Sequence, residues 1–255
     1  MDRRELATPD CTFGKLSRSA WNALKGKWAV AIGAFALAAV IKGAAQQIPI
    51  AGPLFAGYFL VPLDAGVMFF CLKLIRGEKT PIESIFDLFS DYWRYVWGGV
   101  RVALFVFLRA LPLIADGILL GLCCLGYDGS DADTGWLALP ILALIVLLPV
   151  LTIPPVIAGL RYGMTIYIMI DRPEYSAKDA MDESAAIMYG RKGQYFGYGL
   201  LIGLIAIPVT VFTLGIGLFW FIPWAGVFTA LFYESILGHE TIPEVPEIAG
   251  DTAEA

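Results

Sequence analysis

The sequence predicts an all-α membrane protein: a polytopic bundle of about six transmembrane helices, with two amphipathic helices at the cytoplasmic interface and a weak internal duplication. Three observations predict this fold: the apolar composition, six hydrophobic bands, and an uneven distribution of Lys and Arg. Of the 255 residues, 58% are apolar and only 16% are charged, which is unusual for a soluble domain of this length. The bands cover residues 28–47, 53–75, 96–124, 136–170, 194–213 and 217–237, and most are long enough for a helix to cross a bilayer core of ~30 Å.

The basic residues predict the topology. None of the 18 Lys and Arg residues lies in the gaps near residues 48–52, 125–135 and 214–216, whereas they gather before the first band and after the second and fourth bands. Because cytoplasmic loops retain positive charge, the N-terminus and the gaps after bands two and four are predicted to be cytoplasmic. Six crossings return the C-terminus to the same side, so we expect a multi-pass protein of the cytoplasmic (plasma) membrane. Tryptophan favours membrane boundaries, and the seven tryptophans agree with this topology: Trp21, Trp28, Trp93 and Trp97 at the inner face, and Trp136, Trp220 and Trp224 at the outer face.

Three parts follow from these patterns. Residues 1–27 form a cytoplasmic N-terminal segment, residues 28–237 the transmembrane domain, and residues 238–255 an acidic tail that is predicted to be disordered. Within residues 15–27, the apolar side chains of Leu16, Ala20, Trp21 and Leu24 share one helical face. This segment is either a helix that lies on the inner membrane surface or a helical lead-in to the first span.

The fourth band is too long for one straight crossing. Its 35 residues would extend ~52 Å as a helix, and it contains Pro140, Pro149, Pro154 and Pro155. We expect one kinked span that continues into the inner interface. The alternative is two short helices, which would invert the topology of everything that follows.

A polar motif recurs 96 residues further along the chain. Its two copies are Arg76-x-Glu78-x-Thr80-x-x-Glu83 and Arg172-x-Glu174-x-Ser176-x-x-Asp179. In each copy the hydroxyl of Thr80 or Ser176 is placed to cap a helix, and the carboxylate of Glu83 or Asp179 to reach back from the third helical position. Pro81 would then occupy the first helical position. Residues 78–94 and 174–192 are therefore predicted to be amphipathic helices at the cytoplasmic interface, in two parallel copies of one unit.

Several short segments resemble one known family. They are Ala23-Leu24-Lys25-Gly26-Lys27-Trp28, Arg76-Gly77, Asp171-Arg-Pro, Glu183-Ser184, Met188-Tyr-Gly190-Arg-Lys192, Tyr195-Phe196, Thr213-Leu-Gly-Ile-Gly217-Leu-Phe-Trp220, Pro223-Trp224 and Phe232-Tyr233. Together they resemble domain-of-unknown-function family 975, a group of bacterial integral membrane proteins. The resemblance covers roughly residues 15–237 and is most specific over residues 171–233. The family's tyrosine after the proline is Trp224 here, which keeps an aromatic residue at that position. The resemblance implies a multi-span membrane fold and assigns no catalytic residue.

Charged residues inside the bands are the candidate polar site, because a charge at bilayer depth is costly and faces a partner or water. Lys42 and Arg161 lie near band ends, from which their side chains can reach the interface. Asp64 and Arg109 lie near the middle of bands two and three, so we expect them to form an ion pair. Asp116 lies two turns beyond Arg109 on the same helical face.

The sequence offers little for catalysis, so the protein is predicted not to be an enzyme. The single histidine, His239, follows the last band, which leaves no buried Ser/His dyad or histidine metal site. No CxxC or Cys/His cluster occurs, and the chain is predicted to bind no metal and no cofactor. Asp64 and Asp116 lack the sequence context of intramembrane aspartyl proteases. Half of a calcium-loop pattern occurs in the predicted outer loop without its distal Glu, at Asp128, Asp131 and Asp133.

The predicted function is a non-enzymatic membrane component or scaffold that acts through its cytoplasmic-face helices. The alternative is a small-solute or proton-coupled permease with a polar site at Asp64 and Arg109. The expected partners are the lipid bilayer and other membrane proteins. No nucleic acid is expected, because no basic surface is large enough to neutralise many phosphates. Three small-residue pairs are expected to let helices approach closely within the bundle: Gly117-x-x-x-Gly121, Gly159-x-x-x-Gly163 and Gly199-x-x-x-Gly203.

Overall fold

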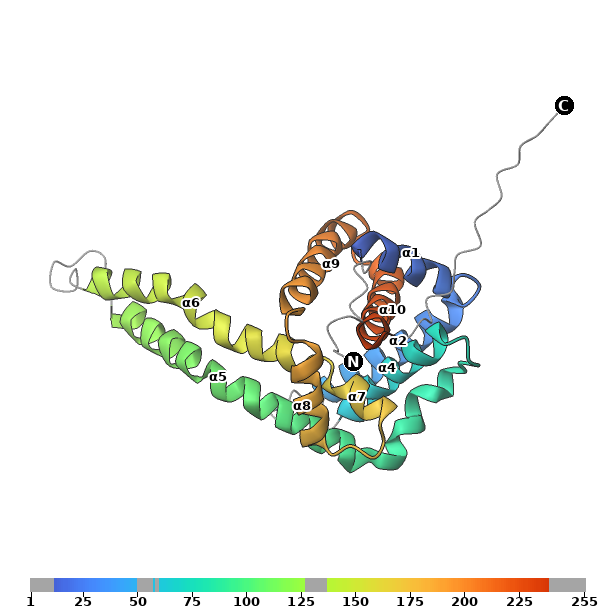
Figure 1. The fold of residues 1–255 in the computed structure, drawn as a ribbon. Coiled ribbons are helices and arrows are strands. Elements are labelled where there is room, and N and C mark those ends of the chain that lie inside the picture. The colour runs from blue at the N-terminus through green and yellow to red at the C-terminus, as the bar shows by residue number, and fades with distance from the viewer. Residues whose placement is uncertain (1–11, 50–56, 58–59, 127–136, 239–255) are drawn as a thin grey trace. The chain divides into compact units, whose positions relative to one another are not determined.

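The computed structural model describes residues 12–49, 57, 60–126 and 137–238 (Figure 1). Within these ranges every regular element is a helix, which confirms the all-α prediction. The predicted acidic tail beyond Gly238, the outer-loop acids Asp128, Asp131 and Asp133, and most of residues 50–59 lie outside the described residues.

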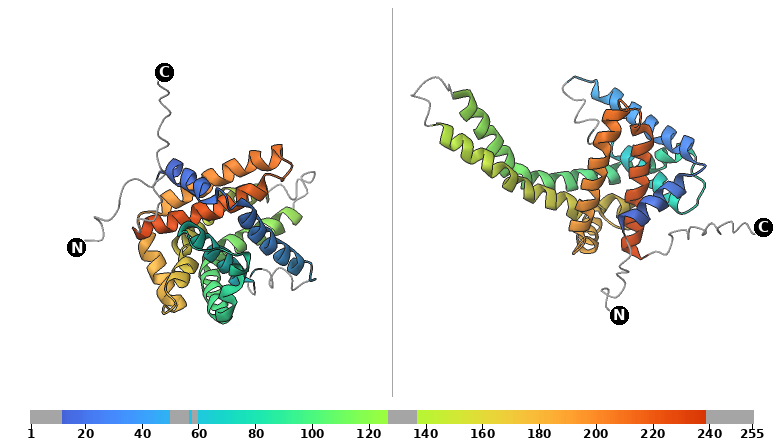
Figure 2. Two further views of the ribbon diagram at one scale, coloured as in Figure 1. Left: turned by 90° about the vertical axis from the view of Figure 1, so that its right-hand side faces the viewer. Right: turned by 90° about the horizontal axis from the view of Figure 1, so that it is seen from above.

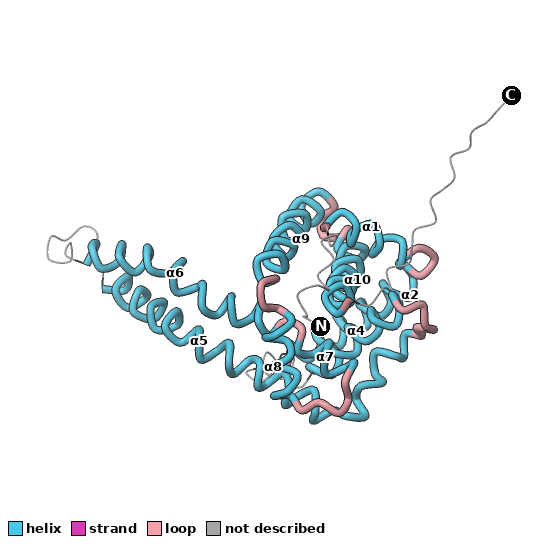
Figure 3. Tube along the Cα trace, in the orientation of Figure 1, coloured by secondary structure: helices cyan, strands magenta, loops and turns pink. Residues whose placement is uncertain are grey.

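The helices follow the predicted bands closely. In chain order they are α1 (Phe13–Leu24), α2 (Trp28–Gln46), α4 (Val61–Ile75), the 3₁₀ helix η2 (Ile82–Asp91), α5 (Tyr92–Gly126), α6 (Ala138–Tyr162), α7 (Thr165–Asp171), α8 (Ala177–Ile187), α9 (Lys192–Phe212) and α10 (Leu218–Leu237). Figure 3 shows how short the described connections between them are. Five described segments are long and apolar enough to cross a membrane: residues 28–46, 82–125, 138–171, 192–212 and 218–237. The remaining predicted span is the second band, which contains α4, and the 15 residues of α4 would extend only about 22 Å.

The described chain separates into two compact units. The first unit contains residues 1–96 and 197–255, and the second contains residues 97–196. The start of α9, up to Phe196, belongs to the second unit, and the start of α5, up to Val96, belongs to the first.

Helix α10 forms the centre of the first unit. It packs against α1, α2 and α4, and α4 also packs against η2. The side chains of Phe228, Phe232 and Tyr233 are almost fully buried. Gly226 lets α2 approach closely, because a Cβ added there would lie only 2.6 Å from the Phe35 ring. Burial of these aromatic residues contributes to the packing of this unit.

Helix α1 is separate from α2 rather than a continuous lead-in. Gly26 adopts a positive φ of 76°, a conformation that glycine reaches without steric cost, in the turn between the two helices. The side chains of Leu16, Ala20 and Leu24 are buried on the face of α1 that packs against α10, while Trp21 is 52% exposed. The apolar face of residues 15–27 is therefore largely covered by the chain itself, with Trp21 on the outside.

In the second unit, α5 and α6 run side by side as a hairpin (Figures 1 and 2). Helix α6 continues through Pro149, Pro154 and Pro155 and ends at Tyr162. Its 25 residues extend about 37 Å, enough for one crossing, whereas the seven residues of α7 extend only about 10 Å. Of these two helices, α6 alone is long enough to cross a bilayer core of ~30 Å.

The predicted close approach at the small-residue pairs is mostly absent. A Cβ added at Gly117, Gly121, Gly159, Gly199 or Gly203 would meet no atom within 4 Å, apart from the helix's own nearby backbone. Only Gly163 lies close to another helix, because a Cβ there would lie 3.2 Å from the Tyr195 ring. Among the described residues, the contact of Gly163 with Tyr195 is therefore the one expected close approach that the structure contains.

The two copies of the repeated motif lie in similar settings. In the first copy η2 packs against α4, and in the second α8 packs against α7. Ser176 and Asp179 form the predicted capping box: the Asp179 amide donates to the Ser176 Oγ (3.3 Å), and the Ser176 amide donates to an Asp179 carboxylate oxygen (3.2 Å).

The predicted cap by Thr80 and Glu83 is wrong. Helix η2 begins at Ile82 with Pro81 in the preceding position, and no side chain caps its first turn. Pro81 has an extended backbone (ψ 156°), so it stands outside the helix instead of opening it, and Thr80 lies one residue too early to cap. The Ser84 hydroxyl donates to the Pro81 carbonyl instead (2.7 Å).

The difference between the copies gives a matched experiment. Ser176→Ala should weaken the first turn of α8 by about 1 kcal/mol, the usual contribution of an N-cap. Thr80→Ala, which removes no cap, should leave η2 unchanged. Hydrogen exchange of residues 178–182 and 82–86 in the detergent-solubilised protein measures both effects, and equal changes in the two variants would contradict this assignment.

The α8 cap should also depend on pH. Two hydrogen bonds lower the pKa of the Asp179 carboxyl below its usual value of 3.8. The bond from the Ser176 side chain has the larger effect, and the bond from the Ser176 amide has the smaller one. Because the pKa of this carboxyl is lower in the folded state, its ionised form stabilises the cap at pH values above 3.8. This stabilisation is lost as the pH falls through the lowered pKa. Protection of the α8 first-turn amides, corrected for intrinsic exchange, should therefore fall at acidic pH in the native chain and much less in Ser176→Ala.

Candidate functional site

The partner that the structure gives Asp64 is Lys42. Asp64 and Arg109 belong to different units, so the ion pair between them stays a prediction. Asp64 lies in the first turn of α4, and the Lys42 ammonium group near the end of α2 lies 2.8 Å from each of its carboxylate oxygens. Both side chains are partly exposed. The hydropathy pattern shows at what depth a charged residue lies in its band, but it does not show which helices are neighbours. The sequence therefore did not identify Lys42 as the partner of Asp64.

Arg109 and Asp116 both lie on α5 in the second unit, in different environments. The Arg109 side chain is exposed, whereas Asp116 is only 5% exposed. Neither carboxylate oxygen of Asp116 has a hydrogen-bond partner among the described residues. Arg161, at the end of α6, is exposed and lies over the Tyr162 ring, with 5.6 Å from the guanidinium carbon to the ring centroid.

A buried ion pair that the sequence analysis missed connects α4 to α10. The Arg76 Nε donates to the Glu234 Oε1 at 2.8 Å, and the Glu234 side chain is only 4% exposed. Two signals could have found this pair: Glu234 is the single charged residue in band six, and Arg76 belongs to the repeated motif. Because a buried carboxylate is costly without a partner, Arg76 holds the end of α4 against α10.

Helix η2 and the start of α5 carry four aromatic side chains in sequence, which we call the aromatic strip: Phe86, Phe89, Tyr92 and Trp93. Their successive ring centroids are 5.8, 6.1 and 5.4 Å apart, and the Trp93 side chain is 62% exposed. Exposed carboxylates of Glu83, Asp87 and Asp91 lie on η2 beside it. Asp87 accepts from Lys73 at 3.1 Å, which ties the strip to α4.

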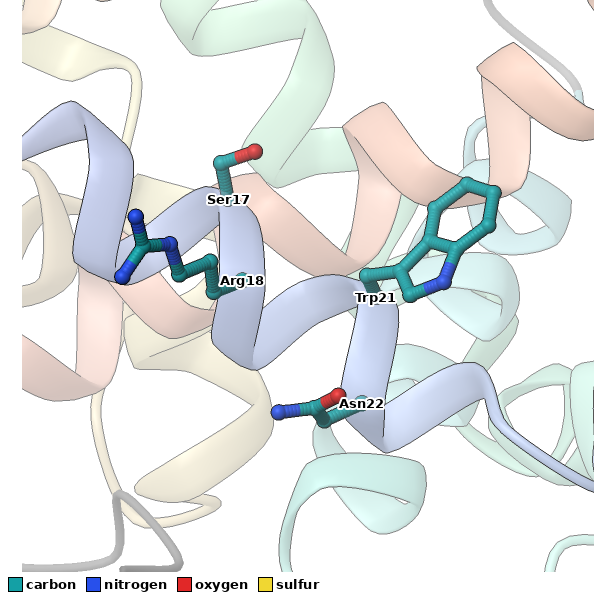
Figure 4. Close-up of a pocket in the computed structure, with 4 residues that line it drawn as sticks. All are labelled: Ser17, Arg18, Trp21 and Asn22. Carbon is teal, nitrogen blue, oxygen red and sulfur yellow. The ribbon is translucent and has the colours of Figure 1, made fainter. Parts of the chain in front are cut away.

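A surface hollow of about 440 Å³ lies on α1 and is lined by Ser17, Arg18, Trp21 and Asn22 (Figure 4). The Trp21 ring stacks edge-on against Trp28, with centroids 5.0 Å apart. Since the described lining comes from one helix and holds one charged group, it contains no arrangement for acid–base or nucleophilic chemistry.

The described residues bring no three His, Cys, Asp or Glu side chains together as metal ligands. Cys71 is buried, Cys123 is partly buried and Cys124 is exposed, all three as free thiols. His239 and Cys11 lie outside the described residues.

Comparison with protein-family models matches residues 15–240 to the family described as "Protein of unknown function (DUF975)". The match includes most of α1 and all the helices from α2 to α10. No curated protein and no solved structure matches the chain in the corresponding searches. The resemblance predicted from the sequence motifs is therefore confirmed.

Proposed function

The chain belongs to the family of proteins of unknown function DUF975, and we propose that it is a non-enzymatic integral membrane protein of the cytoplasmic membrane that binds and organises other membrane proteins. In this proposal both termini are cytoplasmic, and η2 and α8 each provide a binding surface. The five long apolar helices support the membrane location.

The observation that carries the proposal is the aromatic strip beside exposed acids on η2. Aromatic side chains are enriched at the centres of protein interfaces, where burial of a single ring contributes strongly to affinity. Glu83, Asp87 and Asp91 add negative charge beside the strip, so the partner that fits is a basic cytoplasmic segment of another membrane protein. Such segments flank transmembrane helices on the cytoplasmic side.

The internal duplication, which we include in the proposal, gives α8 a related role. Tyr189 follows α8 and is 83% exposed, and the α8 cap contributes the exposed carboxylate of Asp179. Two copies of one surface helix would let the protein contact two partner segments at once, and linking two modest contacts increases overall affinity.

The permease alternative has less support. It depends on a polar site made by Asp64 and Arg109, but the Asp64 carboxylate is held by Lys42. An ion pair between α2 and α4 serves to fix these helices relative to each other.

Photocrosslinking in native membranes tests the proposal. A photoreactive phenylalanine analogue at position 86 should give adducts with other membrane proteins. In the chain with Trp93→Ser, the yield of the same adducts should fall about tenfold, the effect of losing ~1.4 kcal/mol of binding energy at one aromatic contact. Charge reversal at Asp87 and Asp91 should reduce the yield further.

Trp21→Ser provides the matched control, since Trp21 is an exposed tryptophan on α1. It should leave the adducts at position 86 unchanged. If position 86 reacts only with lipid, or if its protein adducts are insensitive to Trp93→Ser, the strip is an interfacial aromatic belt and the proposal fails.

A further inference from the structure

We propose that the outward face of α1, together with the turn that leads to α2, binds the headgroup of an anionic phospholipid. The residues concerned, which we call the α1 surface, are Arg18, Trp21, Asn22, Lys25 and Lys27. This surface contains no residue of the aromatic strip and none of α8. The inference therefore goes beyond the proposed function, and either can fail without the other.

The α1 surface lies at the start of a membrane span. Helix α2 is one of the described segments that are long and apolar enough to cross a bilayer, and it begins at Trp28. Lys25 and Lys27 directly precede this span, which is the usual position of cations at the level of the lipid headgroups. The Trp21 ring packs edge-on against Trp28, with 5.0 Å between the ring centroids, so the end of α1 is held at the same level.

The way in which α1 packs leaves its polar face for the lipid. An amphipathic helix usually binds a bilayer by inserting its apolar face. In α1 that face is covered, because Leu16, Ala20 and Leu24 are at most 1% exposed and the helix packs against α10 and α4. Arg18 and Trp21 remain exposed. Contact with lipid at α1 therefore depends on charge and on one aromatic ring.

The cations of the α1 surface lack a carboxylate partner within the described part of the chain. Residues 11–63 contain five Lys and Arg residues and no Asp or Glu. Helices α4 and α10, which pack against α1, carry one carboxylate each, and both are held by other cations: Asp64 by Lys42 and Glu234 by Arg76. None of the ion pairs between described residues includes a cation of the α1 surface. The surface therefore carries uncompensated positive charge, which attracts anions.

The hollow on α1 supplies donors that suit a phosphate diester. Its volume is about 440 Å³, and its described lining consists of Ser17, Arg18, Trp21 and Asn22, on successive turns of the helix (Figure 4). The guanidinium group of Arg18 can donate two parallel hydrogen bonds to phosphate oxygens. The Asn22 amide and the Ser17 hydroxyl are further donors. The Trp21 ring is amphipathic and favours the headgroup layer.

These features favour a lipid anion over a soluble one. A soluble phosphate would use the donors and cations alone, whereas a phospholipid also places its glycerol and acyl chains against the exposed Trp21 ring and the apolar start of α2. The headgroup must carry net negative charge, because the choline of phosphatidylcholine offsets its phosphate. Each Lys or Arg close to an anionic membrane surface contributes ~1 kcal/mol, which corresponds to a preference of about fivefold.

Photocrosslinking to a lipid analogue tests the site. The full chain is reconstituted in liposomes of phosphatidylglycerol and phosphatidylcholine that contain a phosphatidylglycerol analogue with a photoreactive headgroup. After digestion, mass spectrometry should locate adducts on residues 16–27. Arg18→Gln should lower their yield about fivefold, and Arg18→Lys, which keeps the charge but loses the paired donors, should lower it less. High salt should also lower the yield, because it screens the charges.

Lys178→Gln provides the matched control. It removes one exposed cation from α8, which belongs to the other unit, and should leave the adducts on α1 unchanged. Arg18 and Lys178 are both exposed, so neither substitution removes a packed side chain. Trp21→Ser keeps the charge of the α1 surface and should lower the yield through loss of the aromatic contact, so the two contributions are measured separately.

Three results would overturn the proposal. Adducts that are absent from residues 16–27, or insensitive to Arg18→Gln, would show that the headgroup does not bind the α1 surface. Competition by unlabelled phosphatidylcholine as strong as that by phosphatidylglycerol would mean that the contact does not depend on lipid charge. Equally strong competition by soluble glycerol 3-phosphate would mean that the site takes a soluble phosphate ester instead of a lipid.

Discussion

Arg76→Met should destabilise the protein by about 3–5 kcal/mol, because it leaves the Glu234 carboxylate buried without its partner. Glu234→Leu should cost less, since the Arg76 side chain is 30% exposed and can turn to water. The double variant Arg76→Met/Glu234→Leu should recover most of the loss, because it replaces a buried pair with two apolar side chains. Unfolding in mixed micelles with increasing denaturing detergent gives all three values.

The exposed ion pair between Lys73 and Asp87 is the matched control. Its side chains are 20% and 49% exposed, so Lys73→Met should change stability by less than about 1 kcal/mol. Additive losses in the Arg76/Glu234 cycle, with no recovery in the double variant, would show that the two residues act independently and that the pair does not hold α4 to α10.

The sequence predicted the helices well because hydropathy is a local property. Each band contains a described helix, and the bounds agree to within a few residues with two exceptions. The band of α4 begins among residues that the structure does not describe, and the fourth band contains both α6 and α7. The fourth band was predicted to be one kinked helix, whereas in the structure α6 ends at Tyr162 and α7 begins at Thr165. Composition and spacing are sufficient for this level of structure.

The partners of the charged residues could not be predicted in the same way. We predicted that Asp64 pairs with Arg109 because the two residues lie at similar depths in their bands. Depth does not identify neighbouring helices, and the structure pairs Asp64 with Lys42. Glu234 was missed because one acid near the end of an apolar band resembles a residue that reaches the interface. The burial of Asp116 was partly readable, since it falls in register with the apolar stripe of α5.

The two motif copies show how a single residue changes a local prediction. Both contain a hydroxyl residue three positions before an acid, yet the capping box forms only at Ser176 and Asp179. In the other copy Pro81 is extended and the helix starts one residue later. The packing of η2 against α4 also constrains this start, because η2 is held at Ile85 and Ser84, which are both buried.

Gly66→Ala tests this packing and should have a large effect. A Cβ at position 66 would overlap the Ile85 carbonyl oxygen and lie 2.7 Å from its carbonyl carbon, so the backbone of η2 must move away from α4. Because the obstacle is backbone and cannot rotate aside, we expect a loss of about 3 kcal/mol, at the upper end of the usual cost of overpacking. The release of η2 would also expose Ile85 and Ser84. In a chain that carries Ser84→Cys, the new thiol should therefore react with a water-soluble maleimide when Gly66→Ala is added.

Gly43→Ala is the control for this substitution in the same unit. No atom lies within 4 Å of a Cβ at position 43, apart from the nearby backbone of α2 itself, so this change should be neutral or stabilise α2 by up to about 1 kcal/mol through its helix propensity. If Gly66→Ala is as stable as Gly43→Ala and keeps the thiol introduced at position 84 protected, η2 is not seated on α4 at Gly66. The aromatic strip would then lack the fixed position that the proposed binding surface requires, so this comparison also tests the basis of the proposed function.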